Sequence, residues 1–109
     1  MKKVVESHEK WHPGETGTNV YVEGWVNILS VTEALKNADK AGDLTPGGIR
    51  NAFEQFRNVS TGGLAPPLTF TNKDHRGSMA AKIYEIKDGK MVDVSGWIEL
   101  PRDMEYFGK

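Results

Sequence analysis

The chain has 109 residues, of which 38% are hydrophobic and 27% charged, and this composition excludes disordered and collagen-like proteins. Its 14 basic residues nearly balance 15 acidic ones and are scattered along the sequence, so we expect no nucleic-acid partner, which would need a concentrated positive surface. The absence of cysteine excludes disulfide scaffolds and thiolate chemistry. No signal peptide is visible, because Glu6 and Ser7 stand where an apolar run should continue.

Two helices are predicted in the N-terminal part of the chain. Apolar and histidine residues three and four apart predict a helix over residues 2–12, which Pro13 and Gly14 end. A longer helix is predicted over residues 19–40, where the apolar arc is broad enough to suggest cover on more than one side. The residues of this arc are Tyr21, Val22, Trp25, Val26, Ile28, Leu29, Val31 and Leu35.

A third helix is predicted over residues 46–57. Thr45 can cap its free backbone N–H groups, and Pro46 suits the first helical position. The apolar stripe of this helix consists of Ile49, Ala52, Phe53 and Phe56. Gly42 is predicted to end the preceding helix in the left-handed conformation.

The second half of the chain is predicted to be loop and β structure. Paired glycines and prolines make residues 58–67 a loop, and residues 68–71 a short strand. Two β-prone runs at 79–86 and 91–99 flank an Asp-Gly pair, which favours a type I′ hairpin. The segment from Pro101 onward is expected to be partly frayed.

The sequence HEKWH, from His8 to His12, matches the HExxH pattern of zinc metalloproteases. On a helix the two histidines share a face and could ligate zinc, with Glu9 activating water and Glu33 as a third ligand. Pro13 ends the helix directly after the second histidine, and Lys10 puts a cation inside the motif. We therefore favour a half-exposed helix in which Trp11 packs, and we keep a zinc hydrolase as an alternative.

Two further groups of residues are weighed in the same way. Asp74 could orient His75 as a catalytic dyad, but no serine or cysteine partner can be placed beside them, so we favour a structural turn. Aromatic side chains at helical spacing could line a pocket, although such residues more often pack in a core. These aromatic residues are Tyr21, Trp25, Phe53 and Phe56.

From Asn19 onward the order of motifs resembles one family. The stretches are NVYVEGWVNILSVTEALKNADKAGDLTPGGIRNAFEQF, then GGLAPPLTFTNKDHRG, then AAKIYEIKDGKMVDVSGWIE. Together they resemble the C-terminal end of a substrate-binding protein of the branched-chain amino-acid ABC-transporter type. The resemblance implies an α+β fragment of the α/β type I periplasmic binding fold, with two or three helices followed by a short strand and a β-hairpin.

The resemblance also implies a place and a role for each part. Residues 1–57 would be a helical segment of the N-terminal lobe, and residues 58–109 a loop and hairpin segment of the C-terminal lobe, in one fragment. The parent would act in the periplasm or outside the cell, pass an amino-acid-like solute to an ABC permease, and use no metal, organic cofactor or catalysis. Val20, Tyr21 and Glu23, at the start of the long helix, would face the ligand.

Without the rest of such a parent, the apolar helix faces would lie in water, at a cost of roughly 25 cal/mol per Å². The residues concerned are Trp25, Ile28, Leu29, Phe53 and Phe56. We expect the fragment to bind no ligand alone and to self-associate, by exchanging helices or strands between chains. A second alternative to the transport function is a free-standing interaction module whose hairpin edge or apolar helix face receives a partner.

Overall fold

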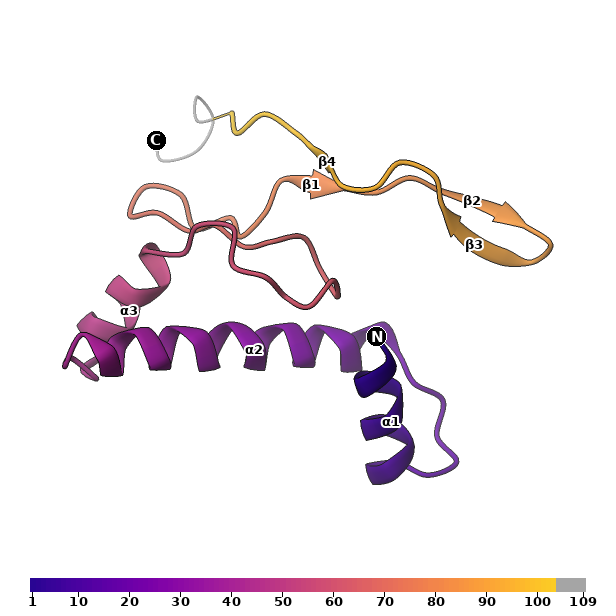
Figure 1. Ribbon diagram of the computed structural model, residues 1–109, viewed down its shortest axis with the longest axis horizontal. Coiled ribbons are helices and arrows are strands. Elements are labelled where there is room, and N and C mark those ends of the chain that lie inside the picture. Colours follow the sequence, from indigo (N-terminus) through magenta and orange to yellow (C-terminus); the bar gives the residue numbers. More distant parts are fainter. Residues whose placement is uncertain (104–109) are drawn as a thin grey trace.

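The computed structural model describes residues 1–103, in which helices precede small antiparallel sheets, so the chain is an α+β structure (Figure 1). The helices are α1 Lys2–Trp11, α2 Asn19–Lys40 and α3 Pro46–Glu54. The strands are β1 Ala80–Ala81, β2 Tyr84–Lys87, β3 Lys90–Asp93 and β4 Ile98–Glu99. β1 pairs with β4, and β2 pairs with β3.

The first two helices confirm the sequence prediction almost to the residue. α2 ends as expected, because Gly42 adopts a φ of 73° while the N–H groups of Gly42 and Asp43 donate to the carbonyls of Asp39 and Ala38. One expectation for α1 is wrong. Trp11 does not pack but is 67% exposed, and Val4 is instead the buried residue of this helix.

The third helix is shorter than predicted. Its start is as expected, since the Thr45 hydroxyl accepts a hydrogen bond from the Gly48 N–H at 3.2 Å. Gly48 is needed in this first turn because a Cβ there would overlap Asp43. The helix ends at Glu54 rather than residue 57, and Phe56 lies just beyond it.

Phe56 is nevertheless the centre of the core. It is 1% exposed and packs with Ala34 and Ala38 of α2 and Ala52 of α3. The expectation that its side chain would lie in water is therefore wrong. The partly buried side chains that surround this cluster are Ile49, Phe53, Val59, Leu68 and Phe70.

The β segments differ from the prediction in length but not in their turn. The strand predicted at 68–71 is a single bridge between Leu68 and Val59. The two predicted β runs are each broken in two, so that β1–β4 and β2–β3 form separate ladders. Between β2 and β3, Asp88 and Gly89 both have positive φ, as a type I′ turn requires.

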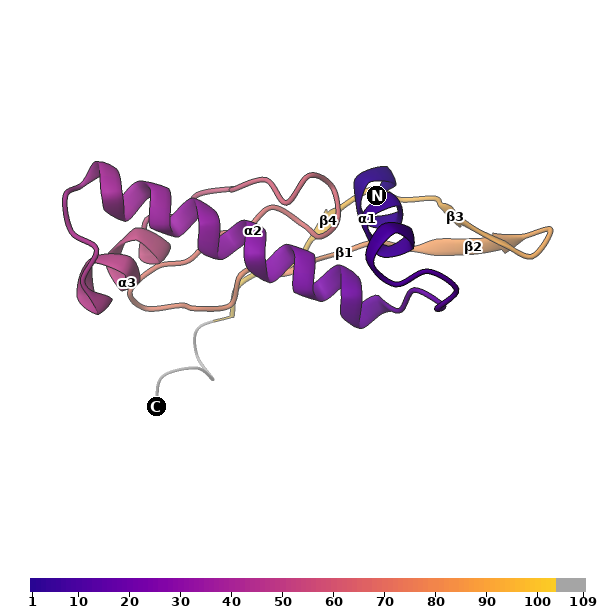
Figure 2. The ribbon, with the colours of Figure 1, turned by 90° about the horizontal axis from the view of Figure 1, so that it is seen from below.

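The molecule is open and elongated. Figures 1 and 2 show the β2–β3 ladder projecting from one end, and α1 projecting from the N-terminal end of α2. Every residue from 83 to 101 is exposed. The radius of gyration is 16.7 Å, against about 13 Å for a compact chain of this length.

Asp74 ties the beginning of the C-terminal tail to the loop before β1. Its carboxylate, on a side chain 8% exposed, accepts two hydrogen bonds from Arg76 at 2.9 Å and one from Arg102 at 2.8 Å. These bonds, from Arg76 above all, hold the pKa of the Asp74 carboxyl well below its ordinary value. The tail was expected to fray from Pro101, but Arg102 is held; residues 104–109 lie outside the described part.

The lowered pKa of Asp74 predicts acid-sensitive stability. The contribution of this carboxylate is present in full above the ordinary carboxyl pKa of about 4 and is lost as the pH falls below it. We expect Asp74→Asn to be less stable than the wild type at neutral pH, with the difference shrinking below about pH 4. Urea unfolding followed by circular dichroism at several pH values measures this, with Asp88→Asn in the exposed hairpin turn as control. An unchanged pH dependence in Asp74→Asn would contradict the assignment.

Candidate functional site

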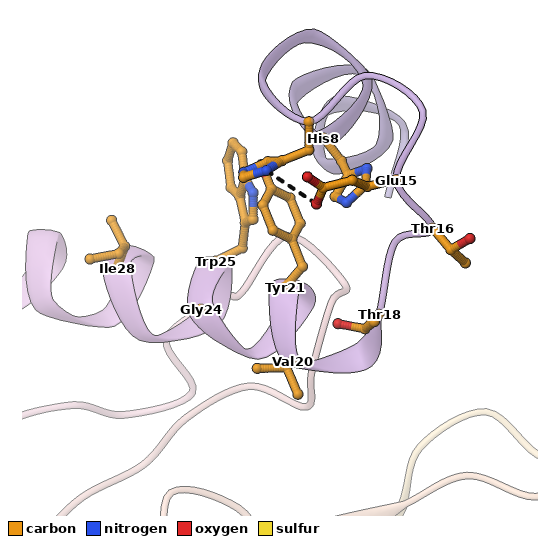
Figure 3. Close-up of a pocket in the computed structure, with 10 residues that line it drawn as sticks. His8, Glu15, Thr16, Thr18, Val20, Tyr21, Gly24, Trp25 and Ile28 are labelled. Carbon is orange, nitrogen blue, oxygen red and sulfur yellow. Dashed lines mark ion pairs between the residues drawn. The ribbon is translucent and has the colours of Figure 1, made fainter.

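A hollow of about 600 Å³ lies between α1 and the start of α2 (Figure 3). Residues 12–18 connect α1 to α2, and α1 lies across the N-terminal end of α2, so that both helices supply the walls of the hollow (Figure 1). The residues that line it are His8, His12, Glu15, Thr16, Thr18, Val20, Tyr21, Gly24, Trp25 and Ile28. We call this hollow the α1–α2 cleft.

Tyr21 holds the two helices together at this cleft. Its ring contacts His8 edge-on at 4.8 Å and His12 at 5.8 Å between ring centroids. Its hydroxyl shares a hydrogen bond with the Ser7 hydroxyl at 3.2 Å. The two imidazoles stack on each other at 5.4 Å, as residues one helical turn apart can.

The lining of the cleft combines the carboxylate of Glu15 with apolar side chains. Glu15 Oε2 lies 3.5 Å from His12 Nδ1, the pair marked in Figure 3, and both side chains are largely exposed. The α2 wall presents Trp25 and Ile28. An apolar surface with a few polar groups is the usual composition of a small-molecule site.

Two of the three residues expected to contact a ligand line the cleft. Val20 and Tyr21 line the cleft, and Val20 is 71% exposed. Glu23 is exposed and is not among the residues that line the cleft. Glu15 was not anticipated, since the loop that carries it has no periodicity from which its position could be read.

The structure brings the two histidines of the HEKWH motif together, but not the glutamates weighed with them as zinc-site residues. His8 and His12 share a face of α1, while Glu9 is exposed. Glu33 lies twelve residues along α2 from Tyr21, which is about 18 Å of helix, beside a different hollow with Val59 and Ser60. Among residues 1–103 no three His, Asp or Glu side chains gather closely enough to hold a metal ion.

Asp74 and His75 have different partners. The Asp74 carboxylate bonds to Arg76 and Arg102, whereas His75 Nε2 lies 3.0 Å from Glu54 Oε1. The pKa of Glu54 is lowered, chiefly by the hydrogen bond from Arg50. The dyad weighed from the sequence is thus two separate structural contacts, as the turn interpretation favoured.

Glu54 and His75 also border a second hollow of about 480 Å³ between α3 and the loop that follows Leu68. Its apolar lining comes from Ile49, Phe53 and Phe70. Phe53 and Phe70 meet edge-on at 6.1 Å and are part of the packing around Phe56. This hollow is therefore an open side of the core, and Arg50 and His75 both meet Glu54 at its border.

The contacts of Tyr21 predict how α1 is held. We expect Tyr21→Ala to release α1, because it removes a hydrogen bond worth about 1 kcal/mol and ring contacts worth about as much again. Amide hydrogen exchange in α1 should then speed up roughly tenfold or more while the amides of α3 keep their rates. Val20→Ala is the control. Equal exchange rates in the wild type and Tyr21→Ala would contradict this role.

Comparison with known proteins leaves the family of the chain open. No protein-family model matches it, and neither does any curated protein or solved structure. None of the helices in the described residues is long and apolar enough to cross a membrane. The likeness to amino-acid-binding proteins of ABC importers accordingly stays an expectation from the residues themselves.

Proposed function

We propose that the chain is part of an extracytoplasmic solute-binding protein, which captures an amino acid or similar small solute and delivers it to an ABC permease. The observation that carries the proposal is that the α1–α2 cleft is not enclosed. The α1–α2 cleft has an apolar wall and a few polar groups, yet it lies open to solvent on an open, elongated molecule. Such a cleft needs a further wall to enclose a solute.

The exposed surface supports the same proposal. The chain exposes 8275 Å², whereas a compact protein of its mass exposes about 6000 Å². Large apolar side chains contribute to this excess on α2 and along the β segments. The excess is what we expect of a segment that packs on other parts of a larger protein.

In the proposed parent, Val20 and Tyr21 would contact the solute's side chain. Both lie at the cleft, and the phenol of Tyr21 offers an apolar ring with a polar tip. Closure of the parent's lobes would exclude water and strengthen the polar contacts. The groups that recognise the ammonium and carboxylate of an amino acid would come from the rest of the parent.

A second candidate is a free-standing interaction module. The β2–β3 ladder favours it, because both of its strands are exposed along their whole length and each has an edge that pairs with no other strand among residues 1–103. The genome sequence upstream of the Met1 codon discriminates the two. A continuous open reading frame of several hundred bases there supports the solute-binding parent, and a stop codon close to Met1 supports the module.

The proposal predicts that the isolated chain binds amino acids negligibly. Calorimetric titration with leucine, valine and other small solutes should give only heats of dilution, because the open cleft buries too little of such a ligand. In the parent protein we expect Tyr21→Ala to weaken solute binding by roughly tenfold or more, an effect of about 1.4 kcal/mol. Glu23→Gln, at a residue outside the lining of the cleft, is the matched control. Micromolar binding by the isolated chain, or a parent indifferent to Tyr21→Ala, would contradict the proposal.

A further inference from the structure

The charges that line the α1–α2 cleft restrict the kind of ligand that it can hold. Among the described residues of its lining there is no lysine or arginine, and Glu15 is the acidic residue. The Glu15 side chain is 69% exposed, so a ligand can reach its carboxylate. With uncharged imidazoles the lining therefore carries one negative charge, which attracts a cation and repels an anion.

An indole ring lies in the same lining as this carboxylate. Trp25 is one helical turn after Tyr21 on α2, so the two side chains share a face of the helix. The Tyr21 ring lies 5.8 Å from the ring of His12, which in turn meets Glu15. In Figure 3 the Tyr21 and Trp25 side chains rise from α2 toward α1, on the side of the cleft where His8 and Glu15 lie.

The other two tryptophans of this chain hold cations on their rings. The ammonium group of Lys10 lies 4.7 Å from the centre of the Trp11 ring, and that of Lys82 lies 4.6 Å from the centre of the Trp97 ring. Trp25 is half-buried in a cleft whose described lining contains no lysine. A ligand would supply the cation there, since the face of an indole ring attracts positive charge.

We propose that the α1–α2 cleft binds a methylated ammonium group, held between the Trp25 ring and the Glu15 carboxylate. The indole face and the carboxylate both attract such a group. Its methyl groups suit the apolar side chains of Val20 and Ile28, whereas a primary ammonium has N–H donors that these side chains cannot satisfy. The inference rests on the proposed function, because it takes the cleft as the place of the solute's side chain and names that side chain as cationic.

The second hollow, beside α3, is a weaker candidate for the same chemistry. Its carboxylate, on Glu54, already accepts a hydrogen bond from Arg50 at 2.9 Å and meets His75 at 3.0 Å. A ligand cation there would be repelled by the guanidinium of Arg50, which also lines the hollow. The Glu15 carboxylate has no arginine or lysine beside it in the described lining of the α1–α2 cleft.

Titration of the isolated chain with choline, followed by NMR at about pH 8 to keep imidazoles uncharged, tests the site. We expect the Trp25 indole N–H signal to shift, with a dissociation constant in roughly the millimolar range because the cleft is open. The signals of Trp11 and Trp97 are internal references. Neohexyl alcohol, in which carbon replaces the nitrogen of choline, should bind roughly tenfold more weakly. Equal binding of the two compounds, or no binding of choline, would overturn the proposal.

Two variants test the groups that hold the cation. Glu15→Gln should weaken choline binding roughly threefold or more, because it removes the negative charge of the lining. Glu9→Gln makes the same change of net charge at an exposed residue outside the lining, and should leave binding unchanged. Trp25→Leu keeps an apolar side chain and should abolish the preference for choline over neohexyl alcohol. Equal effects of Glu15→Gln and Glu9→Gln would contradict the site.

The parent protein separates this inference from the proposed function. A parent that binds leucine or valine, together with a cleft that ignores choline, would overturn the methylated-ammonium site and leave the transport function standing. Choline binding by a chain whose reading frame begins at Met1 would support the site and remove the transport function. A parent that binds a methylated ammonium solute, and loses it on Glu15→Gln but not on Glu9→Gln, would support both.

Discussion

The packing of Phe56 against three alanines holds the described structure together. Ala34 and Ala38 lie one turn apart on α2, and their small side chains let α3 and the segment after it approach the helix closely. The aromatic rings of Phe53 and Phe70 complete the cluster within about 6 Å of Phe56. With so small a core, the remaining elements depend on individual contacts, α1 on Tyr21 and the C-terminal segment on Asp74.

The helices were predictable because their signals are local. The Thr45 cap, the Gly42 stop and the Asp-Gly turn each act through the backbone of a few neighbouring residues. Periodicity places Phe56 in the α3 stripe, but it lies past the helix end. It packs with Ala34 and Ala38 of α2, some twenty residues earlier in the chain, and no local pattern records such a contact. The strands were predicted as continuous because the sequence does not show where cross-strand pairing is interrupted.

Only part of the candidate site could be anticipated. The family resemblance implied Val20 and Tyr21 at the start of α2, whereas nothing in the sequence pointed to Glu15, which reaches the α1–α2 cleft from an irregular turn. Val20 also shows how open the cleft is. It lies at the cleft, but most of its side chain faces water. The proposed parent would supply the missing wall with apolar atoms.

The hydrogen-bonded ion pair between Asp74 and Arg102 affects where the chain tolerates insertions. Residues 77–101 leave the helical part of the molecule next to Asp74 and return to it next to Arg102. The two ends of this segment are joined by the hydrogen bonds of Arg102 to the Asp74 carboxylate and the Arg76 carbonyl. An insertion at the Asp88–Gly89 turn of this segment alters no contact of the Phe56 cluster. Insertions should therefore accumulate there during evolution, and a fluorescent reporter or affinity tag grafted at that tip would leave the helical half undisturbed.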